Sequence, residues 1–328
     1  MIGLKGYRRT TVGKGFFHLL WRLMAICVLV PMVASPASSG LSGVPAIFAD
    51  IGYGARPVAM GGAYVALADD ANSIAWNPAG LVNLQSRQLT LMYANQMSLV
   101  PYYFAAYGQG FAGSQAHSEA IIHTGDDLLS ETTVLLAYAY SAQRLFSPPF
   151  DRLRAGICLK LRRVSFGNNP DGGQQRSQGS ASGFGVDLGA QWRATDKFTL
   201  GFALHDLVNN VFYNNKRTEK YSEAVPAQLT VGVAANPSAN LVVALDFEKS
   251  LYQDTEDVLH FGIERIYLNF LALRAGFYQT LGPEPQRNFP VGFGIRYTFS
   301  SGTTLRLDFA YLFQGLSNTP RLSTTVLF

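Results

Sequence analysis

Histidine and acidic side chains are the groups most able to do chemistry in this sequence, but their spacing does not build a catalytic site. Beyond residue 37 the histidines are His117, His123, His205 and His260. His205 is followed directly by Asp206, and neighbouring residues of a strand point to opposite faces, so this pair does not readily form a dyad. A Gly-x-Ser-x-Gly motif, which would supply a nucleophile, does not occur. These observations predict that the protein is not an enzyme.

The sequence also lacks residues spaced for metal binding and a second cysteine in the mature chain for redox chemistry. The sequence has two cysteines, Cys27 and Cys158. Cys27 lies in a segment interpreted below as a cleaved leader, so the mature chain keeps Cys158 and cannot form an intramolecular disulfide. No run of cysteine, histidine or acidic residues has the spacing of a metal site. Cys158 is therefore predicted to be a small apolar residue of a strand, and neither a metal nor a cofactor is expected.

Residues 1–37 are typical of a secretory signal peptide. The basic residues of this leader are Lys5, Arg8, Arg9, Lys14 and Arg22. The apolar core that follows, LMAICVLVPMV at 23–33, has the length of a signal peptide and is too short to span a membrane. Ser35-Pro36-Ala37 offers small residues for cleavage. We therefore expect an exported protein whose mature chain begins near residue 38.

Removal of this leader changes the charge balance. The whole sequence has a formal net charge of +4, and loss of the five basic residues of the leader, which contains no acid, leaves −1. A near-neutral chain offers no basic surface for nucleic acid. Charged residues make up only 15% of the sequence, against about 25% in ordinary soluble proteins. The composition thus favours a membrane protein that spans with strands, because no long apolar run follows residue 40.

Residues 183–193, GFGVDLGAQWR, alternate with a period of two. One face carries Phe184, Val186, Leu188, Ala190 and Trp192, and the other carries Gly185, Asp187, Gly189, Gln191 and Arg193. Such alternation predicts a strand with one apolar face and one polar or small face. The same pattern recurs in residues 88–97, 101–109, 114–122, 133–142, 153–166, 197–206, 227–235, 241–249, 288–299 and 303–313.

Connection lengths in the second half of the chain alternate between long and short. The long connections are 167–182, 208–225, 250–257, 279–287 and 314–320, and the short ones are 194–196, 236–240, 266–269 and 300–302. Long loops on one rim and short turns on the other are the habit of outer-membrane barrels. The sequence therefore predicts an all-β fold, a transmembrane antiparallel β-barrel of about fourteen strands spanning residues 88–328. Strands in hydrocarbon must close on themselves, because unpaired backbone groups there cost several kcal/mol each.

The charged residues of these strands share the face opposite the apolar one. In a membrane barrel the apolar face meets lipid and the polar face lines the lumen. The predicted luminal charges are Asp187, Arg193, Asp246, Glu248, Arg296, Arg306 and Asp308. Both signs occur, which indicates pairing inside the lumen rather than a selectivity ring of one sign. The chain ends in Phe328, on one face with Leu322 and Val326, and this terminal aromatic residue is predicted to be the signal for barrel assembly machinery.

Residues 38–87 lack this alternation and precede the first strand. Asp70 and Asn77-Pro78 can begin short helical turns, and Gly61-Gly62 permits close approach of backbones. A compact segment of this kind is predicted to fold into the lumen as a hatch.

The motifs of this segment resemble a known family. The runs Gly54 to Pro57, Met60 to Ala63, Ala68-Asp69-Asp70 and Trp76 to Leu81 resemble the N-terminal motifs of PorV/PorQ-type outer-membrane proteins. That family is similar in turn to the long-chain fatty-acid transporter barrels. The resemblance implies a fourteen-stranded barrel in the bacterial outer membrane with an internal hatch. Its hatch-motif residues here are Gly61, Gly62, Asp69, Asp70, Trp76, Asn77 and Pro78, although these residues can equally serve only to shape the plug.

Two functions follow from the resemblance. The first is a passive conduit for hydrophobic small molecules through the outer-membrane lipid. The alternative is a PorV-type scaffold that holds secreted proteins or type IX-like secretion machinery. Its contact surface would be the long loops 208–225 and 279–287, the first of which carries Phe212, Tyr213 and Tyr221. The sequence does not separate these two, because aromatic residues also anchor barrels at a membrane rim.

Overall fold

The computed structural model describes residues 51–96, 99–111, 114–167, 179–208, 210–215, 221–252, 255–313 and 318–328. The predicted leader, residues 1–37, and the first part of the predicted hatch, residues 38–50, lie outside the described residues. The same holds for most of the predicted loop 167–182.

Strands dominate the part of the chain that the structure describes. They are β1 (Gln88–Gln96), β2 (Val100–Phe111), β3 (Gln115–Gly125), β4 (Leu129–Ser141), β5 (Leu153–Phe166), β6 (Gly179–Trp192), β7 (Phe198–Val208), β8 (Asn210–Asn215), β9 (Tyr221–Ala224), β10 (Gln228–Ser238), β11 (Leu241–Ser250), β12 (Val258–Tyr267), β13 (Leu271–Thr280), β14 (Arg287–Thr298), β15 (Thr304–Phe313) and β16 (Thr319–Leu327). Two short 3-10 turns, η2 (Ala142–Arg144) and η3 (Phe150–Arg152), lie between β4 and β5.

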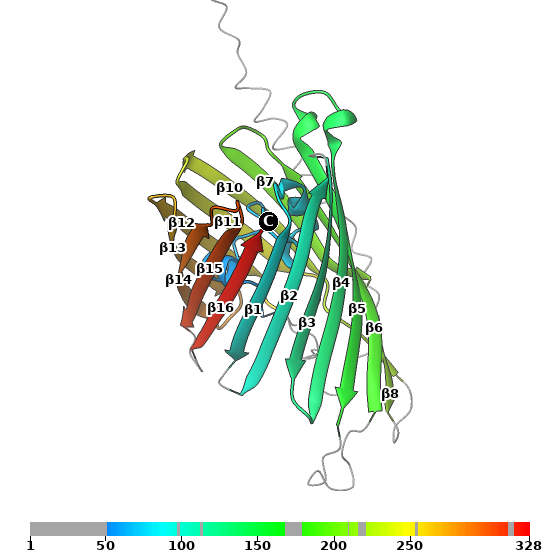
Figure 1. The fold of residues 1–328 in the computed structure, drawn as a ribbon. Coiled ribbons are helices and arrows are strands. Elements are labelled where there is room, and N and C mark those ends of the chain that lie inside the picture. The colour runs from blue at the N-terminus through cyan, green and yellow to red at the C-terminus, as the bar shows by residue number, and fades with distance from the viewer. Residues whose placement is uncertain are drawn as a thin grey trace, which may run out of the picture. The chain divides into compact units, whose positions relative to one another are not determined.

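The strands form one closed antiparallel sheet (Figure 1). Strands β1 to β7 pair in sequence order, β7 pairs with β10, and β10 to β16 again pair in sequence order. β1 pairs with β16 from Gln88↔Leu327 to Ala94↔Arg321, which closes the circle. Residues 186–192 of β6 pair with β7, and residues 179–183 of β6 pair with β8, so β8 continues the line of β7. β9 pairs with β8 and in the same way lies in line with β10. The sixteen described strands thus make a barrel fourteen strands round. The predicted all-β barrel is confirmed.

The predicted loop 208–225 is wrong over much of its length, because β8 and β9 extend the sheet there. The asparagine-rich composition of residues 209–215 indicates a loop, but the side chains of residues 210–214 alternate between exposed and buried. Tyr213 is 5% exposed and Phe212 is 54% exposed, as expected for neighbouring residues of a strand. Inward packing of Val211 and Tyr213 against Val164 and Ala181 therefore outweighs the turn-forming tendency of the asparagines.

Burial along the strands is inverted relative to a soluble protein. Large apolar side chains are exposed on the outer face, among them Leu91, Tyr103, Ile121, Leu136, Ile157, Leu159, Leu161, Phe184, Leu188, Leu245, Phe261, Leu273, Phe293, Ile295 and Leu307. Polar side chains are buried on the inner face, among them Thr90, Ser118, Lys160, Asp187, Gln191, Asp246, Glu264, Arg274, Arg306, Asp308 and Thr325. In water an apolar surface of this extent would be strongly unfavourable, whereas hydrocarbon solvates it.

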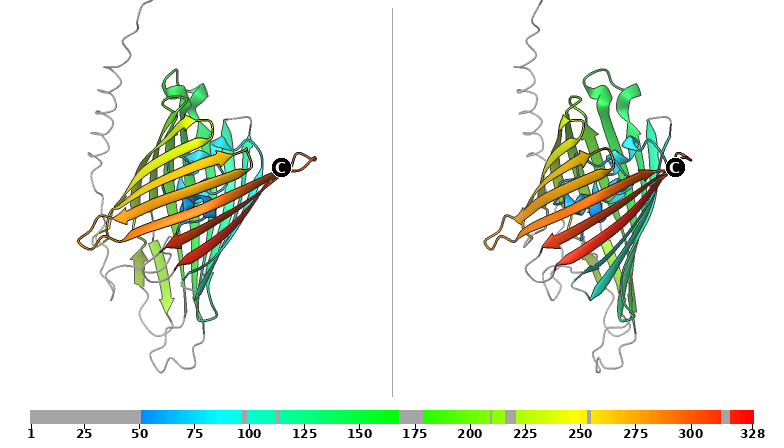
Figure 2. Two further views of the ribbon diagram at one scale, coloured as in Figure 1. Left: turned by 90° about the vertical axis from the view of Figure 1, so that its left-hand side faces the viewer. Right: turned by 60° about the vertical axis from the view of Figure 1, so that its left-hand side comes forward.

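Residues 51–87, called the hatch segment below, lie inside the ring of strands (Figure 2, blue). They form α2 (Ala55–Ala59), α3 (Ser73–Trp76) and the 3-10 helix η1 (Pro78–Asn83). The side chain of Asn77 accepts a hydrogen bond from the backbone of Ala79, and Pro78 stands in the first turn, so this Asn-Pro pair begins η1 as the sequence indicates. None of the helices in the described ranges is long and apolar enough to cross a membrane.

Glycines on the inner face of the strands allow the hatch segment to touch the barrel wall. A Cβ atom on Gly276 of β13 would lie 2.2 Å from the backbone nitrogen of Gly61, and one on Gly201 of β7 would lie 2.5 Å from that of Ala66. Both distances are below any real contact, so any larger residue would displace the hatch segment. The wall therefore fits this particular plug.

Candidate functional site

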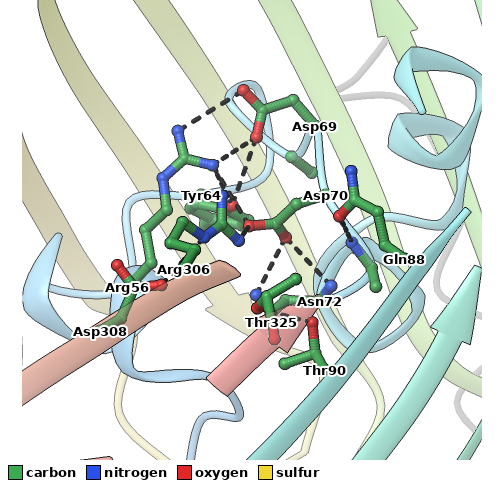
Figure 3. A network of polar contacts seen from close by, with 12 residues as sticks. Arg56, Tyr64, Asp69, Asp70, Asn72, Gln88, Thr90, Arg306, Asp308 and Thr325 are labelled. Atoms are coloured by element: carbon green, nitrogen blue, oxygen red, sulfur yellow. Dashed lines mark hydrogen bonds and ion pairs between the residues drawn. The ribbon is translucent and has the colours of Figure 1, made fainter. Parts of the chain in front are cut away.

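A ring of six charged side chains joins the hatch segment to the barrel wall. Its members alternate in sign in the order Arg56, Glu264, Arg274, Asp308, Arg306 and Asp70, and we call them the charge ring. Arg56 and Asp70 belong to the hatch segment, and the other four belong to β12, β13 and β15. Figure 3 shows Arg56 and Arg306 converging on Asp70 from either side.

Arg56, on helix α2, is one of the two members of the charge ring that belong to the hatch segment. Its guanidinium donates to both carboxylate oxygens of Glu264, with Nε and Nη2 each 3.0 Å from an oxygen. The Nη1 atom donates to the hydroxyl of Tyr64 at 2.9 Å and also contacts Asp69 and Asp70. A bidentate pair of this kind fixes the position of both partners, so α2 is held against β12.

The wall side of the ring is continuous. Arg274 lies 2.6 Å from Glu264 and 2.7 Å from Asp308. Arg306 lies 3.0 Å from Asp308 and 2.7 Å from Asp70. Three cations and three anions are thereby buried together with no net charge, which is the condition under which buried ions are tolerated.

The charges of the ring perturb its hatch members. Burial alone would lower the pKa of Arg56, but Asp69 and Glu264 outweigh this effect and raise the pKa well above its usual value. Burial alone would raise the pKa of Asp70, but Arg306 and Arg56 outweigh it and lower the pKa. Both groups are therefore charged throughout the physiological pH range.

A second attachment lies at β11 and β12. Asp246 accepts hydrogen bonds from the backbone nitrogens of Tyr64 and Val65, at 2.7 and 2.8 Å. The ring nitrogen Nδ1 of His260 lies 2.7 Å from the carbonyl oxygen of Gly61. Gly61 and Gly62 have φ values of 69° and 79°, which glycine adopts without strain, so this turn can pass close to His260.

A third attachment lies at β6, which is separated from β11 by β7 and β10 in the sheet. The Nδ2 atom of Asn77 donates to the carbonyls of Val65 and Ala190, at 2.8 and 3.0 Å. Gln191 donates to the carbonyl of Ala68 at 3.0 Å. The indole nitrogen of Trp76 donates to the carbonyl of Tyr53 at 2.8 Å, which ties the two ends of the hatch segment together. Asn77 and Gln191 thus join the hatch segment to β6, Trp76 joins two parts of the hatch segment, and Pro78 stands in the first turn of η1.

The predicted luminal charges divide into two groups. Asp187, Asp246, Arg306 and Asp308 are buried on the inner face, and Glu248 is partly buried there. Arg193 differs from these inward-facing residues, because β6 ends at Trp192 and the exposed Arg193 side chain lies 3.8 Å from Asp196 in the following turn. Arg193 is therefore a rim residue, and Arg296 is exposed near the end of β14.

Two further predicted residues have described surroundings. His205 does not pair with Asp206 but lies 3.2 Å from Asp187. Phe328 exposes its ring, and its backbone exchanges two hydrogen bonds with Arg87, at 3.0 and 3.1 Å. The terminal residue thus extends the pairing that closes the barrel.

The sequence reasoning missed Arg56, Glu264, Arg274, Lys160 and Arg162 as site residues. Four of these lie on strands at positions of the inward-facing parity, and this alternation was the available signal. Arg56 had no such signal, because its partner Glu264 is 208 positions away in sequence.

A pocket lies between the hatch segment and strands β2 to β7. Its lining residues are Tyr53, Ala75, Tyr102, Ile122, Thr124, Glu131, Thr133, Leu135, Lys160, Arg162 and Asp206. Tyr53 and Ala75 come from the hatch segment, and the remaining residues come from the barrel wall. Five of the lining residues are apolar or aromatic and six are polar or charged, so both kinds of side chain meet in this pocket.

Solved structures of transporter barrels share this fold. The toluene transporter TodX of Pseudomonas putida matches with a TM-score of 0.57 and 16% identity, covering 84% of this chain and 97% of that one. The toluene transporter TbuX of Ralstonia pickettii gives 0.55 and 17%, covering 84% and 97%. The CymD monoaromatic hydrocarbon channel gives 0.58 and 17%, covering 84% and 96%. At this identity the likeness confirms the barrel architecture of the transporter class.

Sequence comparisons reach less far. The family model described as "F plasmid transfer operon, TraF, protein" matches residues 136–248, from β4 to β11. No curated protein matches the chain. The PorV/PorQ part of the predicted resemblance therefore stays a prediction.

Proposed function

We propose that this protein is a bacterial outer-membrane barrel that lets hydrophobic small molecules pass passively. The exposed apolar outer face supports a place in lipid, because only hydrocarbon solvates so large an apolar surface favourably. The structures that share its fold are named as toluene transporters and a monoaromatic hydrocarbon channel.

The pocket beside the hatch segment carries this proposal. Much of the inner face is polar, whereas here Tyr53, Tyr102, Ile122 and Leu135 form an apolar part of the lining. An open aqueous pore would be lined by polar side chains, whereas this pocket has an apolar part beside the hatch segment. A hydrophobic molecule would gain about 25 cal/mol for each Å² of apolar area that it buries there.

An irregularity in the wall adjoins this pocket. The pairing of β6 with β7 shifts register between Val186 and Leu188, and Asp206 adopts a positive φ of 55° at this bulge. Asp206 lines the pocket, whereas Leu207 is exposed on the outer face. The bulge therefore lies in the wall between the pocket and the outer face, and it is our candidate for the exit.

The scaffold alternative loses one of its two predicted contact loops, residues 208–225, while residues 281–286 do connect β13 and β14 as a loop. Phe212 and Tyr213 belong to β8, and the side chain of Tyr213 is buried. The aromatic residues of this stretch therefore extend the barrel wall rather than project as a contact loop. Phe212 on the outer face fits a membrane anchor equally well.

Filling the pocket tests the proposal. Leu135 is 1% exposed and lines the pocket, while its neighbour Leu136 is 43% exposed on the outer face of the same strand. Leu135→Trp should reduce uptake of toluene by whole cells to that of a gene deletion, and Leu136→Trp should leave it unchanged. Heat-dependent electrophoretic mobility shows whether both variants assemble. Equal uptake by wild type and deletion strains, for every hydrophobic compound tried, would overturn the proposal.

A further inference from the structure

The polar half of the pocket is electrically balanced. Its cations are Lys160 and Arg162, and its carboxylates are Asp206 and Glu131. Lys160 lies 3.2 Å from Asp206, and Arg162 lies 2.6 Å from the same carboxylate. Lys160 also lies 2.9 Å from the buried Asp187. The cations that face the pocket therefore already have carboxylate partners.

This balance disfavours two kinds of ligand. An anion in the pocket would compete with Asp206 for Lys160 and Arg162, and it would lie near the like charges of Asp206 and Glu131. A pure hydrocarbon that filled the pocket would displace water from these polar groups and return no hydrogen bond. A neutral molecule with one hydrogen-bonding group avoids both costs.

The sheet register arranges the pocket as a gradient. In the ladder, Thr133 of β4 pairs with Ile122 of β3 on one side and with Arg162 of β5 on the other. Polarity therefore rises across three neighbouring strands, from an alkyl side chain through a hydroxyl to a guanidinium. The apolar hatch residues Tyr53 and Ala75 also line this pocket.

We infer that the pocket selects neutral amphipathic molecules, with an apolar body and one hydroxyl or similar group, over both hydrocarbons and carboxylates. The apolar body lies over Ile122 and Leu135, and the polar group reaches the Thr133 hydroxyl and the charged residues of β5. This inference rests on the proposed function, since it names the substrate class of the same conduit. Thr133 is the specificity-determining residue, because it stands at the boundary of the gradient.

Three probes with the same seven-carbon skeleton test the inference: toluene, benzyl alcohol and benzoate. Their binding to the full chain in detergent is measured by saturation-transfer NMR, and the signal that persists in Leu135→Trp is subtracted as partition into micelles. We expect benzyl alcohol to bind about tenfold more tightly than either of the others, the scale of one hydrogen bond in a partly buried site. Toluene or benzoate binding as tightly as benzyl alcohol would overturn the inference.

Thr133→Val removes the hydroxyl at almost unchanged volume. This change should weaken benzyl alcohol about fivefold and leave toluene unchanged. Thr230→Val is the matched control, because Thr230 is buried on β10 and does not line the pocket. An unchanged preference in Thr133→Val would overturn the assigned role of this residue. Whole-cell uptake tests the conduit separately, so a conduit that prefers toluene would refute the substrate class alone.

Discussion

Replacing Glu264 with glutamine removes one of the three carboxylates of the charge ring while keeping its shape. Glu264 accepts three hydrogen bonds, two from Arg56 at 3.0 Å and one from Arg274 at 2.6 Å. The new amide has one oxygen to accept with, and its NH₂ group faces guanidinium donors. Arg56 keeps Asp69 and Asp70 as partners, and Arg274 keeps Asp308.

The expected cost is about 3–5 kcal/mol, as found when one partner of a buried ion pair is removed. Because Arg56 is the link between α2 and β12, most of this cost should fall on docking of the hatch segment rather than on the barrel. At about 1.4 kcal/mol per factor of ten, a loss of about 3 kcal/mol raises the population of undocked hatch about a hundredfold.

Amide hydrogen exchange reads this population directly. Amides of residues 58–68 should lose about a hundredfold of protection in Glu264→Gln, while those in the ladder between β3 and β4 should change little. Asp196→Asn is the matched control, since it makes the same chemical change in an exposed pair with Arg152, worth about 0–1 kcal/mol. A change of less than about threefold in the hatch amides of Glu264→Gln would refute the view that the charge ring holds the plug.

Two further predictions address the lipid face and the pH response. Leu159→Arg, on the exposed face in the middle of β5, should destabilise the barrel in bilayers by about 2–4 kcal/mol, measured as the shift in urea unfolding; no shift would argue against a lipid-facing surface. Because the pKa of Asp70 is lowered from 3.8, its contribution to docking is complete above pH 3.8 and is lost as the pH falls through the lower folded value. Hatch protection corrected for intrinsic exchange should therefore be constant from about pH 8 to 5 and fall below pH 3.8, and Asp70→Asn should show a smaller fall.

The barrel could be predicted from sequence because its signal is local. Alternation in residues 183–193 assigns Phe184 and Leu188 to the outer face and Asp187 and Gln191 to the lumen, and the structure places all four there. The same reasoning fails where a strand ends. Arg193 has the parity of a luminal residue, but it follows the last residue of β6 and turns into solvent at the rim.

The charge ring could not be predicted in this way, because it depends on the register of strand pairing, which the amino-acid composition does not determine. Glu264 and Arg274 are direct partners in the pairing of β12 with β13, a relation fixed by the turn between these strands. Arg56 joins them only when the hatch segment is folded into the lumen. Predicting the ring would have required the pairing of four strands, β12 to β15, together with the position of the plug.

The charge ring also depends on the absence of a side chain at Gly294 of β14. Arg274 of β13 reaches Asp308 of β15 across the intervening strand β14, whose residue opposite Asp308 is Gly294. A Cβ atom there would lie 2.3 Å from the Oδ1 atom of Asp308 and 2.8 Å from an Nη atom of Arg274. The missing side chain is therefore the gap through which the ion pair forms. The small residues of the inner face thus have two structural roles: Gly201 and Gly276 admit the backbone of the plug, and Gly294 admits the charges that hold it.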